Sequence, residues 1–119
     1  MKLEDLEIYQ LSMEIAQKIW TIAEEWDYLS KKTIGMQLIR SVDSIAANIS
    51  EGFGRYHFKE AKQFTYYARG SLFETKTWLT KANKRNLLEQ SEYEQIVDKI
   101  DVLGVKLNNY INSIGRNNK

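Results

Sequence analysis

Residues 91–115 read SEYEQIVDKIDVLGVKLNNYINSIG, and this stretch decides the fold. Its apolar side chains recur at alternating steps of three and four residues, which is the period of one face of an α-helix. They are Tyr93, Ile96, Ile100, Leu103, Leu107, Tyr110 and Ile114. Ser91 and Glu94 have the S-x-x-E spacing of a helix-capping box, and Gly115 is a favourable residue for a helix end. The stretch therefore predicts an amphipathic helix over residues 92–114.

The same periodicity upstream predicts three more helices, over residues 5–26, 34–53 and 58–85, with ends approximate. Thr33 is the expected N-cap of the second helix. His57, three residues before Glu60, is the expected polar cap of the third. The inner face of the third helix is made mostly of small residues, which permits close helix approach: Ala61, Thr65, Ala68, Leu72, Thr75, Leu79 and Ala82.

The first predicted helix carries two adjacent apolar rows. One row is Ile8, Leu11, Ile15, Ile19, Ile22 and Trp26, and the other is Leu6, Tyr9, Met13, Ala16, Trp20 and Ala23. Together they form a face wider than one helix pair requires. We therefore expect this helix to be buried on two sides, in a homo-oligomer.

Length and composition are consistent with one helical domain. The chain has 119 residues and no proline, so the residue that most strongly interrupts helices is missing. Short connections between long helices make neighbouring helices antiparallel. We predict an all-α fold, an up-and-down antiparallel four-helix bundle that spans residues 1–119 as a single domain. The polar residues 116–119 are expected to fray.

The composition argues against catalytic and metal chemistry. The absence of cysteine excludes disulfides and thiolate sites. His57 is the single histidine, and Gly54 stands where a Glu-x-x-His di-metal motif needs its glutamate. Gly52-Phe53-Gly54 lacks the lysine and spacing of a phosphate-binding loop. We predict no catalytic residues, no metal and no cofactor.

No apolar run approaches the ~18 residues of a membrane span. The acidic N-terminus, MKLEDLEIYQ, lacks the apolar core of a signal peptide. We therefore expect a cytoplasmic protein without a membrane partner.

The second predicted helix carries a polar row beside its apolar face. Its members, at steps of three and four, are Gln37, Arg40, Ser44, Asn48, Glu51 and Arg55. The row is either a solvent-exposed side or a seam of buried hydrogen bonds, because a buried polar group needs a partner. Glu51 is expected to pair with Arg40, Arg55 or Arg69.

The same region carries a family resemblance. Residues 48–55, NISEGFGR, followed by ARGS at residues 68–71, resemble the four-helix bundle proteins, also called large-subunit ribosomal RNA intervening-sequence proteins. The opening LEDLEIY of residues 3–9 fits as well, so the resemblance covers essentially the whole chain. Two departures are Ile39, where a second arginine is usual, and Ala46, where proline is frequent.

The resemblance implies a ring-like homopentamer, and some relatives are encoded within insertions in ribosomal RNA genes. A related accessory protein of diversity-generating retroelements binds nucleic acid and a reverse transcriptase. No catalytic residues are established for the family, whose biochemical role is largely unknown. The matching positions are interpreted as packing or assembly residues: Arg40, Ser44, Asn48, Glu51, Gly52, Gly70 and Ser71.

A row on the third predicted helix interleaves cations with two aromatic residues. It consists of Lys62, Tyr66, Arg69, Phe73, Lys76, Thr80 and Lys84. Such a row can bind phosphates and stack unpaired bases. In the competing interpretation, the aromatic rings pack on a neighbouring helix and the lysines only face solvent. The candidate nucleic-acid-binding residues are Arg55, Lys62, Tyr66, Arg69, Phe73, Lys76 and Lys84.

The net charge of +1 conceals a strong asymmetry. Residues 1–30 contain two cations and seven anions, a net −5, whereas residues 55–85 contain eight cations and two anions, a net +6. The basic segment could bind nucleic acid, or it could dock on the acidic first helix of a neighbouring subunit. We therefore expect a non-enzymatic oligomer that binds nucleic acid, either RNA or DNA and with RNA favoured. The alternative is a scaffolding module whose ring binds another protein.

Overall fold

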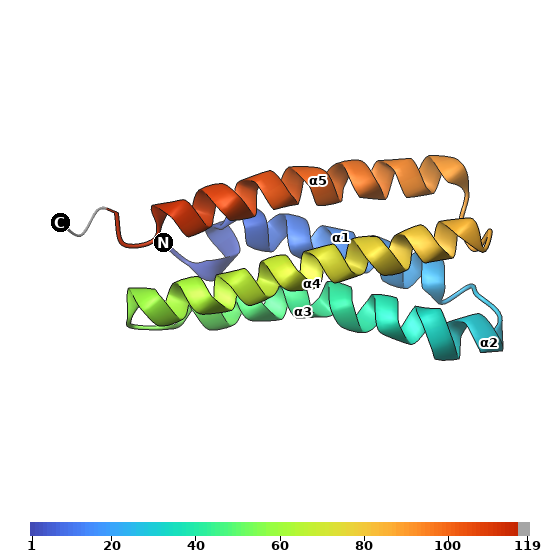
Figure 1. The fold of residues 1–119 in the computed structure, drawn as a ribbon, viewed down its shortest axis with the longest axis horizontal. Coiled ribbons are helices and arrows are strands. Elements are labelled where there is room, and N and C mark those ends of the chain that lie inside the picture. The colour runs from blue at the N-terminus through green and yellow to red at the C-terminus, as the bar shows by residue number, and fades with distance from the viewer. Residues whose placement is uncertain (117–119) are drawn as a thin grey trace.

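The computed structural model describes residues 1–116 as an elongated bundle of 52 × 24 × 21 Å. Four long helices form it: α1 (Glu7–Ala23), α3 (Met36–Phe53), α4 (Phe58–Lys84) and α5 (Gln90–Ser113). Around the bundle axis α1 contacts α3 and α5, and α4 contacts the same two helices, as Figure 1 shows. The all-α prediction of an antiparallel four-helix bundle is confirmed. Residues 117–119, part of the segment expected to fray, lie outside the described residues.

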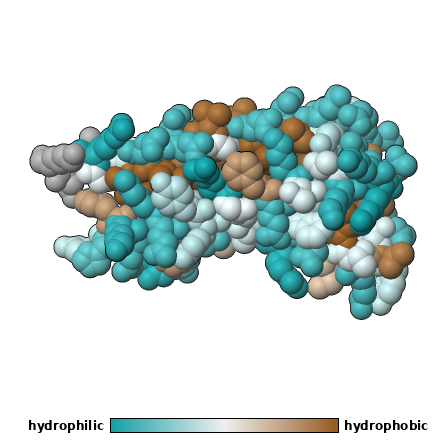
Figure 2. Space-filling model, in the orientation of Figure 1, coloured by the Kyte–Doolittle hydropathy of each residue, from teal (hydrophilic) through white to brown (hydrophobic). Residues whose placement is uncertain are grey.

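Apolar side chains from all four long helices meet along the axis. Ile15, Val42, Ile45, Ile100 and Leu103 are fully buried. Each belongs to the predicted apolar row of its own helix, because the period of the row matches the turn of the helix. The small inner face of α4 is buried too, including Ala68 and Ala82. Outside this core the surface is mostly hydrophilic, with hydrophobic residues gathered along α5 and between α5 and α4 (Figure 2).

Two predicted helix starts are wrong. Thr33 is not an N-cap: it lies inside a π-helical segment, Lys31–Gly35, and its hydroxyl donates to the Leu29 carbonyl at 2.7 Å. The cap is Asp27, whose carboxylate accepts the Ser30 N–H at 3.3 Å. The short helix α2 (Tyr28–Ser30) follows it and runs through the π-helical segment into α3. An acidic cap six residues further upstream therefore replaces the predicted one.

The first helix also ends earlier than predicted, at Ala23 rather than Trp26. Trp26 lies in the connection to α2, and its indole N–H donates to the Leu87 carbonyl at 2.6 Å. This bond ties the end of α1 to the connection between α4 and α5. A short 3₁₀ turn, η1 (Leu3–Asp5), precedes α1.

The capping box of α5 lies two residues upstream of the predicted Ser91 and Glu94. Glu89 is the N-cap, and its N–H donates to the side chain of Glu92 at 3.1 Å. His57 does occupy the N-cap of α4, although its side chain makes no capping hydrogen bond among the described residues. Gly115 follows α5 with φ +84°, a left-handed conformation that suits glycine at a helix end.

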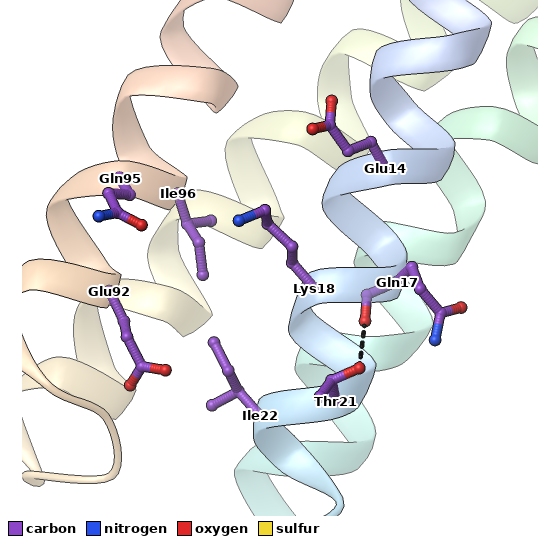
Figure 3. A pocket seen from close by; sticks show the side chains of 8 residues that line it. All are labelled: Glu14, Gln17, Lys18, Thr21, Ile22, Glu92, Gln95 and Ile96. Carbon is purple, nitrogen blue, oxygen red and sulfur yellow. Dashed lines mark hydrogen bonds between the residues drawn. The ribbon is translucent and has the colours of Figure 1, made fainter.

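The seam between α1 and α5 is hollowed at the surface. A hollow of about 510 Å³ lies between the two helices near the end of α1. Lys18, Ile22 and Ile96 point into it, with Glu14 and Glu92 at its edge (Figure 3). Within residues 1–116 no helix is both long and apolar enough to cross a bilayer.

Candidate nucleic-acid interface

The polar row of α3 lies along the side of the helix that faces α4. Ser44 Oγ donates to Ser71 Oγ of α4 at 2.6 Å, and Asn48 Nδ2 donates to the Ser44 carbonyl at 2.9 Å. One turn away, the buried Thr75 hydroxyl lies 3.1 Å from the hydroxyl of Ser41. The central part of the row is therefore a hydrogen-bonded seam between two helices.

Gly52 and Gly70 have different surroundings. A Cβ atom on Gly52 would lie 2.9 Å from the Ala61 carbonyl oxygen and 3.1 Å from Thr65 Oγ1. Only a residue without a side chain lets α3 and α4 approach so closely there. A Cβ atom on Gly70 would meet no atom of the described residues within 4 Å. Packing within the subunit therefore accounts for Gly52 and leaves Gly70 without a structural explanation.

The outer part of the row is charged and exposed. Of the three arginines considered for Glu51, the structure selects Arg55, with a 2.7 Å ion pair. Arg55 also lies 3.9 Å from the carboxylate of Glu60 and over the ring of Phe64. Arg40 lies at the edge of a separate hollow of about 350 Å³. The charge of Arg55 is therefore already compensated by the carboxylates of Glu51 and Glu60 before any phosphate binds.

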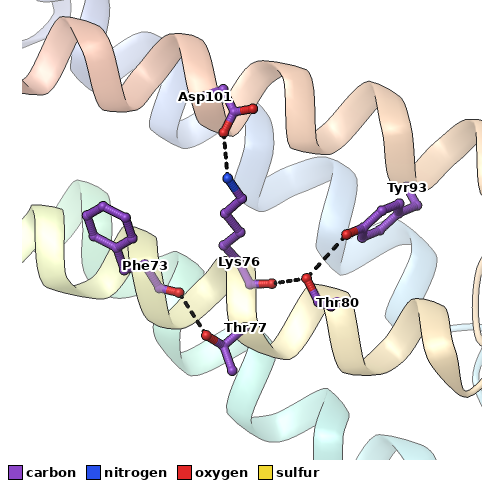
Figure 4. Close-up of polar contacts among 6 residues, drawn as sticks. All are labelled: Phe73, Lys76, Thr77, Thr80, Tyr93 and Asp101. Carbon is purple, nitrogen blue, oxygen red and sulfur yellow. Dashed lines mark hydrogen bonds and ion pairs between the residues drawn. The ribbon is translucent and has the colours of Figure 1, made fainter.

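The basic and aromatic row of α4 lies on the α5 side of the helix. Lys76 Nζ is 2.9 Å from Asp101 Oδ1 of α5 (Figure 4). The Thr80 hydroxyl is 3.2 Å from the Tyr93 hydroxyl, also on α5. This part of the row is occupied by contacts within the subunit.

The remaining members of the row face solvent. Tyr66 is 50% exposed and Phe73 57% exposed, so about half of each residue is accessible to solvent. Lys62 and Arg69 are half-buried and Lys84 is exposed. Within residues 1–116 no ion pair involves any of these three cations. The sequence-predicted row thus divides into an unpaired segment at residues 62–69 and a neutralised one around Lys76. We call the residues Lys62, Tyr66 and Arg69 the basic segment of α4.

Sequence reasoning missed Asp101 as the partner of Lys76. Asp101 follows Ile100 in a helix with acids on several sides, so its own pattern does not distinguish it. The short connection between α4 and α5 is the signal that could have identified it. Counting back along α4 and forward along α5 from this connection brings Lys76 and Asp101 to similar heights on two antiparallel helices. The described residues also hold no cluster of three or more histidines, aspartates or glutamates arranged to bind a metal ion.

Comparison with known proteins agrees with the helical fold. The model of the 23S rRNA-intervening sequence protein family matches residues 4–109. The chain belongs to this family. A crystal structure of a protein of unknown function from the S23 ribosomal protein family of Bacteroides thetaiotaomicron VPI-5482 has the same fold. It aligns with a TM-score of 0.80 at 22% identity, over 89% of this chain and 96% of that one. No functionally curated protein matches the chain.

Several of the residues that carried the family resemblance gather at one place in this intervening-sequence protein. Ser44, Asn48, Gly52 and Ser71 lie at or beside the contact between α3 and α4. Their arrangement holds two helices close together. The basic segment of α4 lies on the other side of the same helix, where cations and a half-exposed ring can meet a charged polymer.

Proposed function

We propose that this intervening-sequence protein is a non-enzymatic, oligomeric RNA-binding protein that uses the basic segment of α4. One observation carries the proposal: the half-exposed ring of Tyr66 lies between two cations, Lys62 and Arg69, that have no ion-pair partner within residues 1–116. The family description, which concerns insertions in 23S rRNA, makes RNA the favoured polymer.

The spacing suits a single strand. Residues 62, 66 and 69 are one helical turn apart, so the two cations are separated by ~10 Å along the helix axis. Each cation can contact a phosphate and release counterions, while a base stacks on the tyrosine between them. Stacking on one aromatic ring contributes about 1–3 kcal/mol.

The other candidate residues contribute less or act at a distance. Arg55 and Lys76 must exchange carboxylate partners for phosphates. Exposed ion pairs are weak, so this exchange is possible but yields little net free energy. Phe73 continues the row by one further turn. Lys84 lies ~33 Å from Lys62 along the helix and would contact a different part of a long RNA.

The test measures affinity for a fluorescent single-stranded RNA by anisotropy over a series of salt concentrations. Lys62→Glu with Arg69→Glu should reduce affinity at least tenfold. It should also lower the slope of log K against log salt by about 1.4, since each phosphate contact in a single strand contributes ~0.7. Tyr66→Ala should weaken binding roughly 5-fold to 150-fold at all salt concentrations.

The matched control is Lys18→Glu with Lys32→Glu, which changes the net charge equally at residues outside α4. If this control lost as much RNA affinity as the α4 double variant, net charge alone would explain the effect. That result would contradict the proposed site. Unchanged binding in the α4 double variant would also contradict it. If a DNA strand of the same sequence bound as tightly as the RNA, the protein would bind nucleic acid in general and would not prefer RNA.

A second candidate function, a scaffold for another protein, is favoured by the half-exposed Trp20 on α1. A partner protein recovered equally with and without nuclease treatment, from the wild type and from the Lys62 and Arg69 double variant, would support it over RNA binding. In either function we propose a homo-oligomer, with a pentamer expected from the family resemblance. A monomer at micromolar concentration in light scattering would contradict the oligomer.

A further inference from the structure

A basic hollow lies where the π-helical segment Lys31–Gly35 and the start of α3 meet the last turns of α4. Its volume is about 350 Å³. Three cations from three different elements line it: Lys32 of the π-helical segment, Arg40 of α3, and Arg85, the C-cap of α4. Trp78 of α4 lines it too, and none of the lining residues of the described chain is acidic. We call this hollow the Arg40 pocket.

The charge of the three cations is not compensated inside the subunit. All three are exposed, and within residues 1–116 none of them forms an ion pair. The ring of Tyr28 lies 5.2 Å from Lys32 Nζ, so an aromatic face and not a carboxylate contacts this lysine. A further cation, Lys81, has its Nζ 5.2 Å from the centroid of the Trp78 ring. A hollow lined by charges of one sign concentrates ions of the opposite sign, so the Arg40 pocket suits an anion.

The helix dipole explains only part of this cluster. Basic residues in the last turn of a helix stabilise its C-terminus. This effect accounts for Lys81, Lys84 and Arg85 at the end of α4. Lys32 and Arg40 lie in the π-helical segment and near the start of α3, so neither is at the C-terminus of a long helix. Their convergence with Arg85 on one hollow therefore needs another explanation.

The walls of the Arg40 pocket are apolar and aromatic. Ile34 is buried, Met36 is 47% exposed and Trp78 is half-buried. The indole Nε1 of Trp78 donates to the carboxylate of Glu74 at 3.0 Å, which orients the ring. The amide of Gln37 lines the same space and offers both a donor and an acceptor. The pocket thus combines a cationic rim with an apolar wall and one neutral hydrogen-bonding group.

This combination matches a nucleotide better than other anions. The planar guanidinium of arginine binds phosphate oxygens in a bidentate manner, and two arginines line the pocket. An aromatic side chain stacks with a base, and a glutamine amide can bind a base edge. Inorganic phosphate would leave the apolar wall without a contact. The volume lies at the low end of the roughly 300–1,000 Å³ of small-molecule sites, so it suits one nucleotide and not a duplex.

The Arg40 pocket is separate from the basic segment of α4. Trp78 follows Arg69 by nine residues, about two and a half helical turns, so the two side chains leave α4 on opposite sides. The pocket also lies at the end of α4 that leads to α5, whereas the basic segment lies toward Phe58 (Figure 1). A ligand in the pocket therefore leaves the basic segment free.

We propose that the Arg40 pocket binds a nucleotide through its 5′-phosphate. Lys32, Arg40 and Arg85 hold the phosphate, and the base packs against Trp78. The nucleotide is either free or the 5′ end of an RNA strand. This inference goes beyond the proposed function, which uses the basic segment of α4. It gives Arg40, interpreted from the family resemblance as a packing or assembly residue, a role in ligand binding.

The first test titrates the full chain with each of the four nucleoside 5′-monophosphates by isothermal titration calorimetry. At least one should bind, and it should bind at least tenfold more tightly than its nucleoside or than ribose 5-phosphate. The reason is that only the complete nucleotide contacts both the cationic rim and the aromatic wall. Arg40→Gln with Arg85→Gln should weaken this binding at least tenfold, since it removes two of the three phosphate ligands.

The matched control is Lys62→Gln with Arg69→Gln, which removes the same charge from the basic segment of α4. It should leave nucleotide affinity within about twofold of the wild type. Light scattering verifies that each double variant has the oligomeric state of the wild type. If the loss of Arg40 changes that state, Lys32→Gln with Arg85→Gln takes its place and should weaken nucleotide binding equally.

The second test separates the two sources of the nucleotide. The same single-stranded RNA is compared with a 5′-phosphate and with a 5′-hydroxyl group by fluorescence anisotropy. If the phosphorylated strand binds at least fivefold more tightly, and the Arg40 and Arg85 variant loses this advantage, the ligand is the end of a strand. Equal affinities of the two strands, beside binding of a monophosphate, assign the pocket to a free nucleotide.

Three results would overturn the proposal. One is that no nucleoside monophosphate binds at millimolar concentration. Another is that the nucleotide binds no more tightly than its nucleoside or ribose 5-phosphate, and the third is unchanged nucleotide affinity in the Arg40 and Arg85 variant. A chain that binds RNA through the basic segment of α4 but no nucleotide would overturn the Arg40 pocket alone. A chain that binds a nucleotide in the pocket but no RNA through the basic segment would overturn the RNA function alone.

Discussion

The α3–α4 seam and the α1–α5 seam both join two neighbouring helices, but their contact residues differ in size and chemistry. Between α3 and α4 the contact residues are small and polar, and Ser44 and Ser71 share a 2.6 Å hydrogen bond. Between α1 and α5 the helices stand further apart and long side chains bridge them. Lys99 reaches Glu14 at 3.0 Å there. A further lysine, Lys106, reaches Glu7 near the other end of the seam.

The difference lies in how much each seam can relax. A seam made of glycine, serine and threonine has no flexible side chain that can move aside, so one added methyl group must separate two backbones. A seam bridged by lysines borders a hollow of about 510 Å³, which accommodates changes at low cost. We therefore expect the same kind of substitution to be costly in the first seam and mild in the second.

The largest effect is expected from Gly52→Ala. The new Cβ atom would lie 2.9 Å from the Ala61 carbonyl oxygen, which belongs to a helix backbone and cannot rotate away. We expect a loss of about 2–3 kcal/mol in the free energy of unfolding, measured in urea. Gly70→Ala is the control, because its Cβ atom meets nothing within 4 Å among the described residues. It should stabilise the exposed helix by about 0.5–1 kcal/mol. Equal effects at the two positions would contradict a tight α3–α4 seam.

A moderate effect is expected from Thr75→Val in the same seam. Thr75 is fully buried, and its hydroxyl contacts the hydroxyl of Ser41 at 3.1 Å and the Ser71 carbonyl at 2.7 Å. The nearly isosteric valine keeps the volume and removes these hydrogen bonds, so we expect a loss of about 1–2 kcal/mol in urea unfolding. Thr77→Val, at an exposed position of the same helix, should change stability by less than about 0.5 kcal/mol. If Thr75→Val left the free energy of unfolding unchanged, the seam would depend on shape alone and not on these hydrogen bonds.

A smaller effect is expected from Lys106→Met in the α1–α5 seam. Lys106 and Glu7 form an exposed ion pair, which solvent and salt screen. The urea midpoint should shift less than for Thr75→Val. The shift should nearly vanish in about 1 M salt, where the Debye length is ~3 Å. A large shift that persists in high salt would show that the lysine stem, rather than its charge, closes this seam.

The smallest effect is expected from Glu7→Gln, which should change how the stability of the fold depends on pH. The hydrogen bond and charge of Lys106 hold the pKa of Glu7 below its usual value of 4.5. A carboxyl group with a lowered folded-state pKa contributes stability above its unfolded pKa and loses it as the pH falls through the folded value. The urea midpoint of the variant should therefore fall less than that of the wild type between pH 5 and pH 3. Parallel curves would contradict a contribution from this pair.

The sequence predicted the fold class and most of the buried row of each long helix, but it placed two helix starts wrongly. At the end of α5 the buried residue is Ile111 rather than the predicted Ile114. Glu89 and Ser91 both precede an acidic residue by three positions, so two overlapping capping boxes fit the same stretch. Thr33 and Asp27 are likewise both good N-cap residues. Which one caps the helix depends on where the preceding chain leads. Trp26, tied to the Leu87 carbonyl at 2.6 Å, helps to set that path.

The candidate site was predictable only in part, because its pairing depends on contacts between different helices. The sequence placed Lys62, Tyr66, Arg69, Phe73 and Lys76 on one side of a helix, and the structure keeps them there. It could not show that α5 brings Asp101 to Lys76. The division of the row into a basic segment and a part neutralised around Lys76 is therefore a result of the structure.

By itself the sequence determined which residues share a helix face, because that relation depends only on spacing along one chain and on the fixed turn of a helix. It also determined the charge asymmetry between the first helix and the third, and the family. Only the tertiary structure decided which faces meet and which remain at the surface. Those relations depend on the rotation and register of helices packed against one another, which no periodicity within a single helix encodes.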